Sequence, residues 1–306
     1  MNVEYAPVAL FVYNRYDLLP NVLESLERNK YVEESELYIF SDGPKNEIDC
    51  ERVEKVRNII RSFSKTSSFK NVFIKEKPVN TGLAESIIHG VSELMDKYGK
   101  IIVVEDDLIL SRDFLRFMND SLLFYENNKR VWSIGGCTYG LSALEKYRYD
   151  VYACWRGESW GWASWKDRWD KVKWYEKKYS NIKNNIINWF RFCRGGSDLP
   201  RSLYYTEKGK DDSWAVRWCF EESMEDAYTI LPRRSLVYNM GLINGTHRNN
   251  SENPFNIEIT DEFEYVLENV EPDKGIMEEF REYFEHSSLH LYSSIKAWIY
   301  SRVYRR

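Results

Sequence analysis

Through residues 1–135, short apolar runs alternate with longer segments in which apolar residues recur at helical spacing. The short runs predict strands and the longer segments predict helices. The expected strands are Val8–Tyr13, Leu37–Phe40, Val72–Ile74 and Ile101–Val104, and the expected helices are Leu18–Leu26, Val53–Phe63, Gly82–Tyr98 and Phe114–Tyr125. Asp17 is the expected N-cap of the first helix. Strands that alternate with helices imply right-handed crossovers, so this half predicts a Rossmann-like α/β fold with a mainly parallel sheet.

The pattern becomes irregular in the second half of the chain. Further strands are expected at Val131–Ile134, Val151–Cys154 and Ile230–Tyr238. Residues 156–218 are rich in Trp, Gly and charged residues, which predicts short helices and loops that form a lid or a ligand-binding lobe. From Ile276 onward the spacing is helical again. We expect residues 136–255 to complete the domain that residues 1–135 begin, and residues 256–306 to form a helical extension.

Composition narrows the class of protein. An apolar content of 43% with 30% charged residues is ordinary for a globular chain and unlike a disordered one. The 16% aromatic content, with 11 Trp and 22 Tyr, suits a cleft for sugars or other ring-shaped ligands, with an aromatic core as the alternative. A net charge of −5 argues against nucleic acid as a partner.

Cysteine usage and the chain ends carry little targeting signal. The five cysteines form no CxxC pair or Cys/His cluster, so neither a disulfide framework nor a zinc site is expected. The N-terminus lacks a signal-peptide pattern and no apolar stretch is long enough to cross a bilayer, which predicts a cytoplasmic protein. The spacing of the last residues predicts an amphipathic, basic helix over Leu291–Val303. It either docks on the body or lies peripherally on anionic lipid at the inner face of the membrane.

A strand that ends on three acids is the most informative feature of the chain. The segment Lys100–Leu110 reads KIIVVEDDLIL, so Glu105, Asp106 and Asp107 follow four buried aliphatic residues directly. Adjacent carboxylates at a sheet edge are costly unless a cation is present. Mg²⁺ or Mn²⁺ bound to one or two carboxylates and to phosphate oxygens would answer that cost. An acidic surface turn is the alternative. Because α/β folds bind ligands at the carboxyl ends of parallel strands, we expect a metal-bound nucleotide there.

The ordered motifs resemble those of GT-A fold glycosyltransferases. They are the opening PVALFVYNR, the acidic strand end EDD and the later segment SWGWASWKDRW. The likeness covers most of residues 7–250, and it is closest to bacterial family 2-like sugar transferases and the N-acetylglucosaminyltransferase I family. It implies metal-dependent, inverting transfer from a nucleoside diphosphate sugar to a hydroxyl of a glycan or lipid-linked glycan, as in bacterial surface polysaccharide synthesis. Residues 1–135 would bind the donor, and residues 136–255 the acceptor.

The resemblance assigns a donor side to the site. Asn14 and Arg15 would contact the nucleotide, and Asp42 would accept a hydrogen bond from uracil, which favours a UDP-sugar. Gly82 and Leu83 would line the nucleotide-sugar. Alternatively, Arg15 is a surface ion-pair residue and Gly82 belongs to a simple turn before a helix.

In the same resemblance the acidic segment binds the metal and the donor. Asp107 would coordinate the cation directly, whereas Glu105 and Asp106 would touch the sugar, the ribose or metal-bound water. His247 would complete the metal shell or contact phosphate, and Arg248 would neutralise the leaving diphosphate.

The resemblance also assigns an acceptor side. Trp160-Gly161-Trp162 would form the wall beneath donor sugar and acceptor, with core packing as the alternative. Asp212 best matches the aspartate that takes the proton from the acceptor hydroxyl, and Asp211 is the second candidate.

The register of that match is open and the base has a competitor. Lys210 stands where the family pattern often has an aromatic residue. Glu158 is a further carboxylate in an aromatic setting.

Two other functions compete with the glycosyltransferase. A sugar-nucleotide nucleotidyltransferase would share the sheet and the acidic site, but it normally has a glycine-rich loop after the first strand, and Tyr13–Leu19 contains no glycine. A non-catalytic carbohydrate-binding protein would use the tryptophans alone. The complete set of acids argues against that loss of catalysis.

Overall fold

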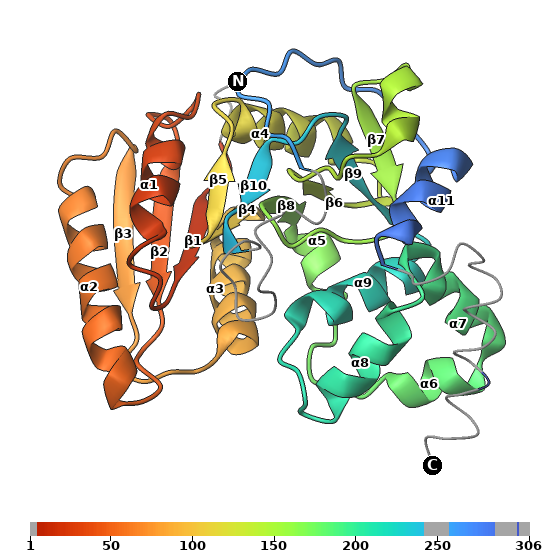
Figure 1. Cartoon of the computed structure of the whole chain (residues 1–306), viewed down its shortest axis with the longest axis horizontal. Coiled ribbons are helices and arrows are strands. Elements are labelled where there is room, and N and C mark those ends of the chain that lie inside the picture. The colour runs from red at the N-terminus through yellow and green to blue at the C-terminus, as the bar shows by residue number, and fades with distance from the viewer. Residues whose placement is uncertain (1–4, 242–256, 285–298, 300–306) are drawn as a thin grey trace.

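The computed structural model describes residues 5–241 and 257–284, together with Ile299. A mixed, mostly parallel sheet of eight strands runs through the molecule in the order β3-β2-β1-β4-β8-β6-β9-β7, with helices on both faces (Figure 1). A separate two-stranded sheet joins β5 and β10. The strands are β1 (Val8–Val12), β2 (Glu36–Ser41), β3 (Asn71–Glu76), β4 (Lys100–Glu105), β5 (Leu108–Leu110), β6 (Val131–Gly135), β7 (Val151–Cys154), β8 (Trp162–Trp165), β9 (Tyr228–Pro232) and β10 (Val237–Asn239).

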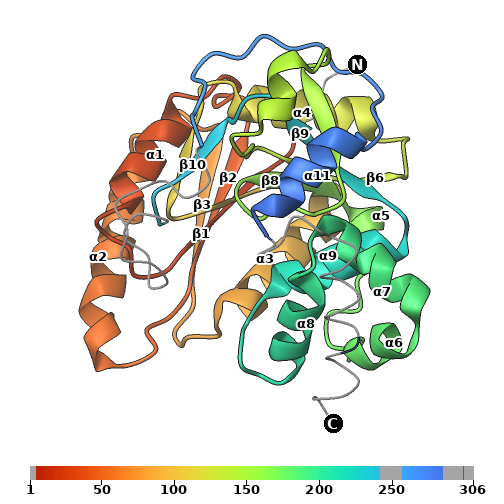
Figure 2. The ribbon, with the colours of Figure 1, turned by 45° about the vertical axis from the view of Figure 1, so that its right-hand side comes forward.

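The helices cover the sheet and build a lobe beside it. They are α1 (Leu19–Glu27), α2 (Glu47–Phe63), α3 (Leu83–Tyr98), α4 (Phe114–Tyr125), α5 (Lys166–Trp169), α6 (Tyr179–Asn184), α7 (Ile186–Phe192), α8 (Leu199–Glu207), α9 (Trp214–Met224) and α11 (Lys274–Glu282), with 3₁₀ turns η1 (Ser142–Lys146) and η2 (Cys193–Gly195). Helices α6 to α9 form the lobe, and α9 packs against α3 (Figure 2). Among the described residues no helix has the length and apolar character needed to span a bilayer.

The first strand shows why the apolar runs form a central sheet. All five residues of β1 are buried, and alternate side chains enter different cores. Val8 and Leu10 pack with α1 and α4, whereas Ala9 and Phe11 pack with α3. A strand covered on both faces needs a continuous apolar run, which is what the sequence has. The predicted α/β fold with a mainly parallel sheet is confirmed.

Two local predictions need correction, and one strand was missed. Asp17 does not cap α1, because the N-cap residue is Leu18 and no side chain caps the helix. The predicted strand Ile230–Tyr238 is two strands: β9 ends at Pro232, whose nitrogen cannot donate to a sheet, and β10 then pairs antiparallel with β5. Strand β8 was not predicted, although it joins the two halves of the sheet between β4 and β6.

Tryptophans from the second half form a core under the lobe. Trp162 stacks on Trp169 and Trp214, with ring centroids 5.9 and 5.2 Å apart. Trp218 lies 4.9 Å from Trp132 on the same measure. All five side chains are buried. For these residues the alternative of an aromatic core is therefore correct, and the predicted contact of the Trp162 side chain with a ligand is wrong because none of its surface is exposed.

The C-terminal prediction is reached only in part. Helix α11 confirms that helical structure begins close to Ile276. The segment Leu291–Val303, on which the lipid-contact hypothesis rests, lies outside the described residues except for Ile299.

Candidate functional site

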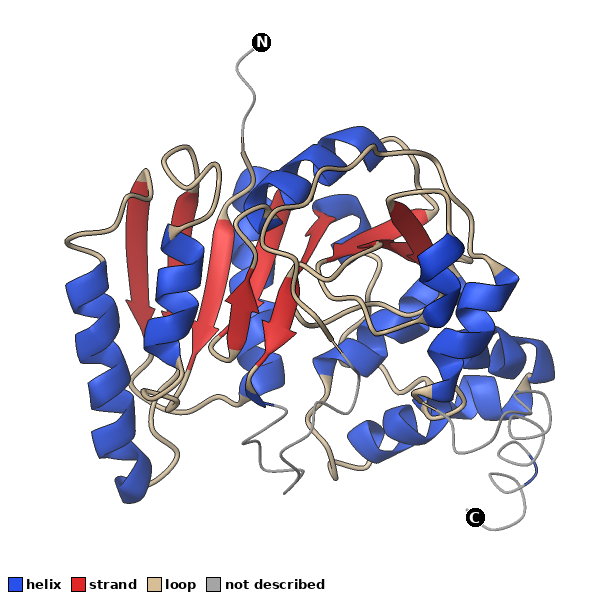
Figure 3. Ribbon diagram, turned by 45° about the horizontal axis from the view of Figure 1, so that its top comes forward, coloured by secondary structure: helices blue, strands red, loops and turns tan. Residues whose placement is uncertain are grey.

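Parallel pairing brings the predicted donor-side residues to one edge of the sheet. Strand β1 lies between β2 and β4 and is parallel to both. Figure 3 shows the arrowheads of these neighbouring strands at the same edge. The segments that leave this edge are Tyr13–Arg15, Asp42 and Glu105–Asp107.

The acidic segment is held by the end of β1. The backbone N–H of Tyr13 donates to Asp106 Oδ2 at 2.9 Å. Arg15 donates through Nη1 to Asp107 Oδ2, and its Nε lies 3.9 Å from Asp106 Oδ1. Among the described residues these are the ion pairs of the segment, so Glu105, Asp106 and Asp107 share a single cation.

Because so little positive charge is nearby, the pKa values of the three carboxyl groups are raised. Burial, followed by the charges of Asp107 and Asp106, raises the pKa of Glu105 to about 8. Burial and the charge of Asp107 raise the pKa of Asp106 to about 7. The pKa of Asp107 is also raised by burial, although Arg15 opposes that shift. Excess negative charge in a low-dielectric site favours any cation that can enter.

The three acids have the chemistry to bind a hard divalent cation, but their side chains do not converge on a common point. Three carboxylates with one arginine supply the oxygen ligands and the uncompensated charge that Mg²⁺ or Mn²⁺ requires. However, within the described ranges no group of three or more His, Cys, Asp or Glu side chains is arranged to hold a metal ion. Asp106 faces the Tyr13 amide and Asp107 faces Arg15 instead.

Asp42 fixes the turn that starts α3. Its carboxylate accepts from the backbone N–H of Thr81 at 3.0 Å and of Gly82 at 3.1 Å. Gly82 has φ of +87°, a conformation that side chains of L-residues rarely adopt, and it is the N-cap residue of α3. The predicted turn is therefore at the site edge, with Leu83 exposed at the first helical position. The role of Asp42 in base recognition stays a prediction.

A second carboxylate reaches the same turn from the lobe. Asp212 Oδ2 accepts from the backbone N–H of Ala84 at 3.3 Å, and it lies 3.0 Å from where a Cβ at Gly82 would be. Asp212 precedes Ser213, the N-cap of α9, whose side chain accepts from the Val216 N–H. The start of α3 thus lies between Asp42 of the sheet edge and Asp212 of the lobe. The structure brings these distant predicted residues together.

Two cavities adjoin the start of α9. One, of about 450 Å³, is lined by Thr206, Gly209, Lys210, Asp211, Asp212 and Arg217. The other, of about 190 Å³, has Glu158, Trp160 and Asp211 among its lining residues. Asp211 belongs to both cavities. Both predicted candidates for the base are exposed.

Glu158 has a positioning role in the smaller cavity. Its Oε1 accepts from the backbone N–H groups of Ser159 and Trp160, and its Oε2 accepts from the Tyr139 hydroxyl at 3.1 Å. The side chain is 7% exposed, and burial raises its pKa. These bonds hold the segment that carries Trp160 and Gly161, and Gly161 has φ of +68°.

Several contacts at the site could not be read from the sequence. Asn14 donates to Asp49 of α2 at 3.0 Å, so a predicted nucleotide contact is tied to a helix residue that carried no motif. The Met240 N–H donates to the Asp107 carbonyl at 2.8 Å, and Gly241 lies so close that a Cβ there would meet Asp107 Oδ2. The antiparallel pairing of β5 with β10 brings this part of the chain back to Asp107. His247 and Arg248 lie outside the described residues.

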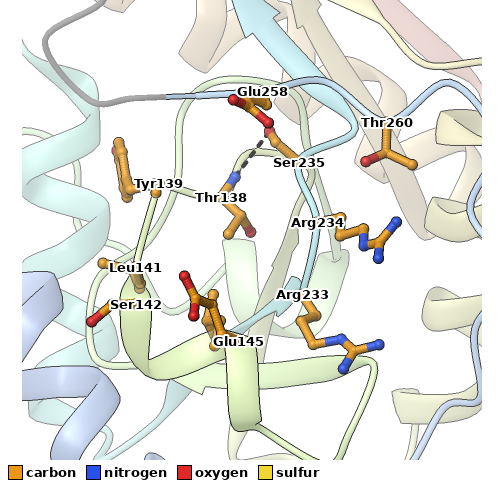
Figure 4. A pocket seen from close by; sticks show the side chains of 12 residues that line it. Thr138, Tyr139, Leu141, Ser142, Glu145, Arg233, Arg234, Ser235, Glu258 and Thr260 are labelled. Carbon is orange, nitrogen blue, oxygen red and sulfur yellow. Dashed lines mark hydrogen bonds between the residues drawn. The ribbon is translucent and has the colours of Figure 1, made fainter.

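A larger cavity contains none of the predicted site residues. Its volume is about 760 Å³, and the close view shows Thr138, Glu145, Arg233 and Arg234 among the side chains around it (Figure 4). Tyr139 lines both this cavity and the smaller one beside Glu158.

The comparison with known families identifies the class. Residues 8–123 match the profile of the family described as Glycosyl transferase family 2. This range includes Asn14, Arg15, Asp42 and the acidic segment, so it contains the whole donor-side edge described above. This match and the mostly parallel sheet flanked by helices agree with a GT-A fold. The match covers the first part of the chain, and that part is similar to the family 2 glycosyltransferases.

Solved structures and curated proteins add likenesses of lower similarity. S. aureus TarS, residues 1–349, has a TM-score of 0.43 and 11% identity over 77% of this chain and 60% of TarS 1–349. The mannosyltransferase PcManGT from Pyrobaculum calidifontis, in complex with GDP-Man and Mn²⁺, has a TM-score of 0.41 and 10% identity over 72% and 74% of the two chains. The chain thus spans less than two thirds of the TarS fragment. A comparison with curated proteins finds no significant match.

Proposed function

We propose that the protein is a glycosyltransferase that moves a sugar from a nucleoside diphosphate sugar, with a UDP-sugar favoured, to a hydroxyl of a glycan acceptor with inversion at the anomeric carbon. The observation that carries the proposal is the group of three acids beside Arg15 at the carboxyl edge of β1 and β4. Their pKa values are raised because burial, with repulsion between the acids at Glu105 and Asp106, outweighs Arg15, the cation that reaches them among the described residues. A cation with its diphosphate is the ligand that such a group suits.

The donor would lie along the edge between Arg15 and the turn that starts α3. Arg15 is part-exposed, with 37% of its side chain accessible, so it can exchange Asp107 for a phosphate oxygen. Asp42 and the Asn14–Asp49 pair would border the base, and Gly82 and Leu83 the sugar. Backbone N–H groups at the start of α3 add a partial positive charge on that side.

Asp107 is the residue that would hold a divalent metal, with Asp106 and Glu105 beside it. Bound there, Mg²⁺ or Mn²⁺ would act as a Lewis acid that stabilises the charge growing on the leaving diphosphate. The protein's own part is to position the diphosphate with Arg15 and to keep water from Asp106, which is 9% exposed. His247 and Arg248 stay proposals for the phosphate side.

The acceptor hydroxyl would be deprotonated by a residue of the lobe, at the start of α9. Asp212 is the proposed base and Asp211 the second candidate. Both lie at the start of α9, across the α3 turn from Asp42, in a cavity large enough for a sugar ring. A single base opposite a bound leaving group supports direct displacement, and hence inversion. The acceptor would be a glycan or a lipid-linked glycan of a surface polysaccharide.

A ligand panel tests the proposal. The unfolding temperature of the protein is measured with UDP, GDP, CMP and dTDP, and with their sugars, each with and without Mn²⁺. The expected result is stabilisation by one nucleoside diphosphate that requires Mn²⁺ and disappears in Asp107→Asn. Asp96→Asn is the matched control, because Asp96 is 71% exposed on the opposite end of α3.

Other outcomes separate the alternatives. Stabilisation by free glycans alone would contradict the proposal and favour a binding protein. Formation of a nucleotide-sugar from a sugar phosphate and a nucleoside triphosphate would favour the nucleotidyltransferase.

A further inference from the structure

The lobe differs in charge from the rest of the chain. The protein has 48 acids against 43 Lys and Arg. Residues 171–210 nevertheless contain ten Lys or Arg and three Asp or Glu. The positive charge of such a basic segment is neutralised either by acids of the protein or by a ligand.

Some of these cations pair with acids in α9 or directly after it. Lys171 pairs with Glu225 at 2.5 Å, Arg194 pairs with Asp226 at 2.7 Å, and Lys178 pairs with Glu221. These pairs attach residues 171–194 to α9 and to the two residues that follow it. They are structural and leave no charge for a partner.

The cations of α8 are different. Arg201, Lys208 and Lys210 are exposed, and within the described part of the chain none of them lies in an ion pair. Two of the acids near them, Asp198 and Glu207, are already engaged. Asp198 binds Arg156 at 2.9 and 3.0 Å. Glu207 accepts from the backbone of the α6 start.

Tyrosines alternate with these cations. Arg201, Tyr205 and Lys208 have the spacing of one helix face. Lys210 Nζ lies 5.6 Å from the Tyr205 ring centroid, and Lys208 Nζ lies 5.7 Å from that of Tyr204. We call the surface formed by these five residues the α8 stripe.

The α8 stripe leads to the candidate base. Lys210 lines the cavity of about 450 Å³ together with Asp211, Asp212 and Arg217. Thr206 of α8 lines the same cavity, and Ser202 lines the smaller one. A chain bound along α8 would therefore deliver one end to the start of α9. Arg217 adds a further cation at that end.

We infer that the α8 stripe binds the acceptor, and that this acceptor is an acidic glycan bearing carboxylate or phosphate groups. The inference rests on the proposed glycosyltransferase function, and it adds the acceptor's chemical class. Tyrosine rings pack on sugar faces while their hydroxyls stay in water, and lysine or arginine pairs with the anionic groups. Part-exposed cations of this kind discriminate by charge more than they add affinity.

The composition of the stripe favours a glycan over a membrane surface. An interfacial helix exposes large aliphatic residues beside its cations. The exposed aliphatics of the lobe, Ile186 and Ile187, lie on α7, and α8 exposes tyrosine instead. The vesicle arm of the experiment tests this choice.

The experiment compares two triple variants by fluorescence polarisation with labelled oligosaccharides. One variant is Arg201→Ala/Lys208→Ala/Lys210→Ala. Its matched control, Arg52→Ala/Lys65→Ala/Lys70→Ala, removes exposed cations that form no ion pair within the described residues and that lie around α2, away from the lobe. The probes are a hyaluronan oligosaccharide for carboxylate, a glycerol phosphate oligomer for phosphate, and maltohexaose as the neutral chain.

The expected result is tighter binding of at least one acidic probe than of maltohexaose, weakened by salt. The α8 variant should lose about tenfold in affinity for it, while the control variant binds like the unaltered protein. Equal binding of acidic and neutral probes, or an α8 variant that binds normally, would overturn the inference. So would an α8 variant that keeps glycan binding but no longer binds phosphatidylserine vesicles.

The response to UDP and Mn²⁺, measured on the same samples, separates this inference from the proposed function. If that response is intact and no acidic preference exists, only the acceptor assignment fails. If the unaltered protein lacks the response, the function on which it rests fails.

Discussion

Two aspartates that lie close in sequence show opposite ways of placing a charge in this protein. Asp113, just after β5, is fully buried and pairs with Lys30 at 2.7 Å and Arg116 at 2.8 Å. It also accepts from the Phe263 N–H at 2.8 Å. Burial alone would raise the pKa of Asp113, but Lys30, that N–H and Arg116 hold it below its usual value.

Asp107, just before β5, is treated differently. It and its two acidic neighbours share Arg15, and the pKa of each is raised. Acids of the first kind stabilise the fold, because cations of the protein compensate their charge. Acids of the second kind cost stability and are kept for a ligand that arrives later. This comparison separates structural from functional carboxylates, and four predictions test it.

The largest effect is expected for the base. Asp212→Asn should lower kcat by about 10²- to 10⁴-fold, because the acceptor hydroxyl loses its proton acceptor. The amide can still accept from the Ala84 N–H, so α3 should start as before. Stabilisation by UDP and Mn²⁺ should persist. Asp211→Asn is measured in parallel, and the variant with the larger loss of kcat identifies the base. Full activity in both would move the base elsewhere.

Asp107→Asn tests the uncompensated acids directly. Transfer should fall by about 10²- to 10³-fold, because the leaving diphosphate loses electrostatic support. The free energy of unfolding without metal should be unchanged or higher, because a repulsive charge is removed. Kinetics and denaturant unfolding of one sample check both parts. A clear loss of stability would place Asp107 with the structural acids.

The reverse outcome is expected for Asp113→Asn. The free energy of unfolding should fall by about 3 kcal/mol, because two cations lose their buried partner. The effect belongs at the lower end of the range, since 40% of the Lys30 side chain is exposed. Transfer by the folded fraction should stay normal. The control Asp96→Asn, whose partner Lys166 is exposed, should lose about 0.5 kcal/mol or less.

The smallest effect, counted per pH unit, concerns Glu222, a buried acid that forms no ion pair within the described residues. Burial raises the pKa of Glu222 to about 8, although Thr229 donates to it at 2.7 Å. Between the ordinary carboxyl pKa and this value the folded state holds a proton that the unfolded state has lost. Stability should therefore fall as pH rises through this window, by up to about 1.4 kcal/mol per pH unit for this one proton. Glu222→Gln should remove that slope. Denaturant unfolding at pH 5 and pH 8 measures it, and an unchanged slope would assign it to other groups.

Residues in the first half could be predicted because local patterns there decide the structure. Val8–Val12 and Ile101–Val104 are continuous apolar runs, which leave no choice but a strand covered on both faces. Parallel neighbours end at the same edge, which agrees with the common site that the family resemblance implies for Arg15, Asp42 and Asp107. Helix α4 has the predicted limits, Phe114–Tyr125.

The second half could be predicted less well because its pairings are long-range. Trp162–Trp165 has no pattern that marks a strand, and only the gap between β4 and β6 makes it β8. Trp160 and Trp162 look equivalent in the sequence. Yet one lines a cavity, while the other is enclosed by the tryptophan core.

The sequence alone determined the α/β class, the acidic strand end and the residue types available for donor and base, because these depend on local periodicity and on side-chain chemistry. The tertiary structure decided which acids are neutralised: among the described residues, Lys30 and Arg116 reach Asp113, whereas Arg15 alone reaches Asp107. It also decided that Asp42 and Asp212 meet at the start of α3. Charge compensation depends on distances in space, and residues far apart in the chain set those distances.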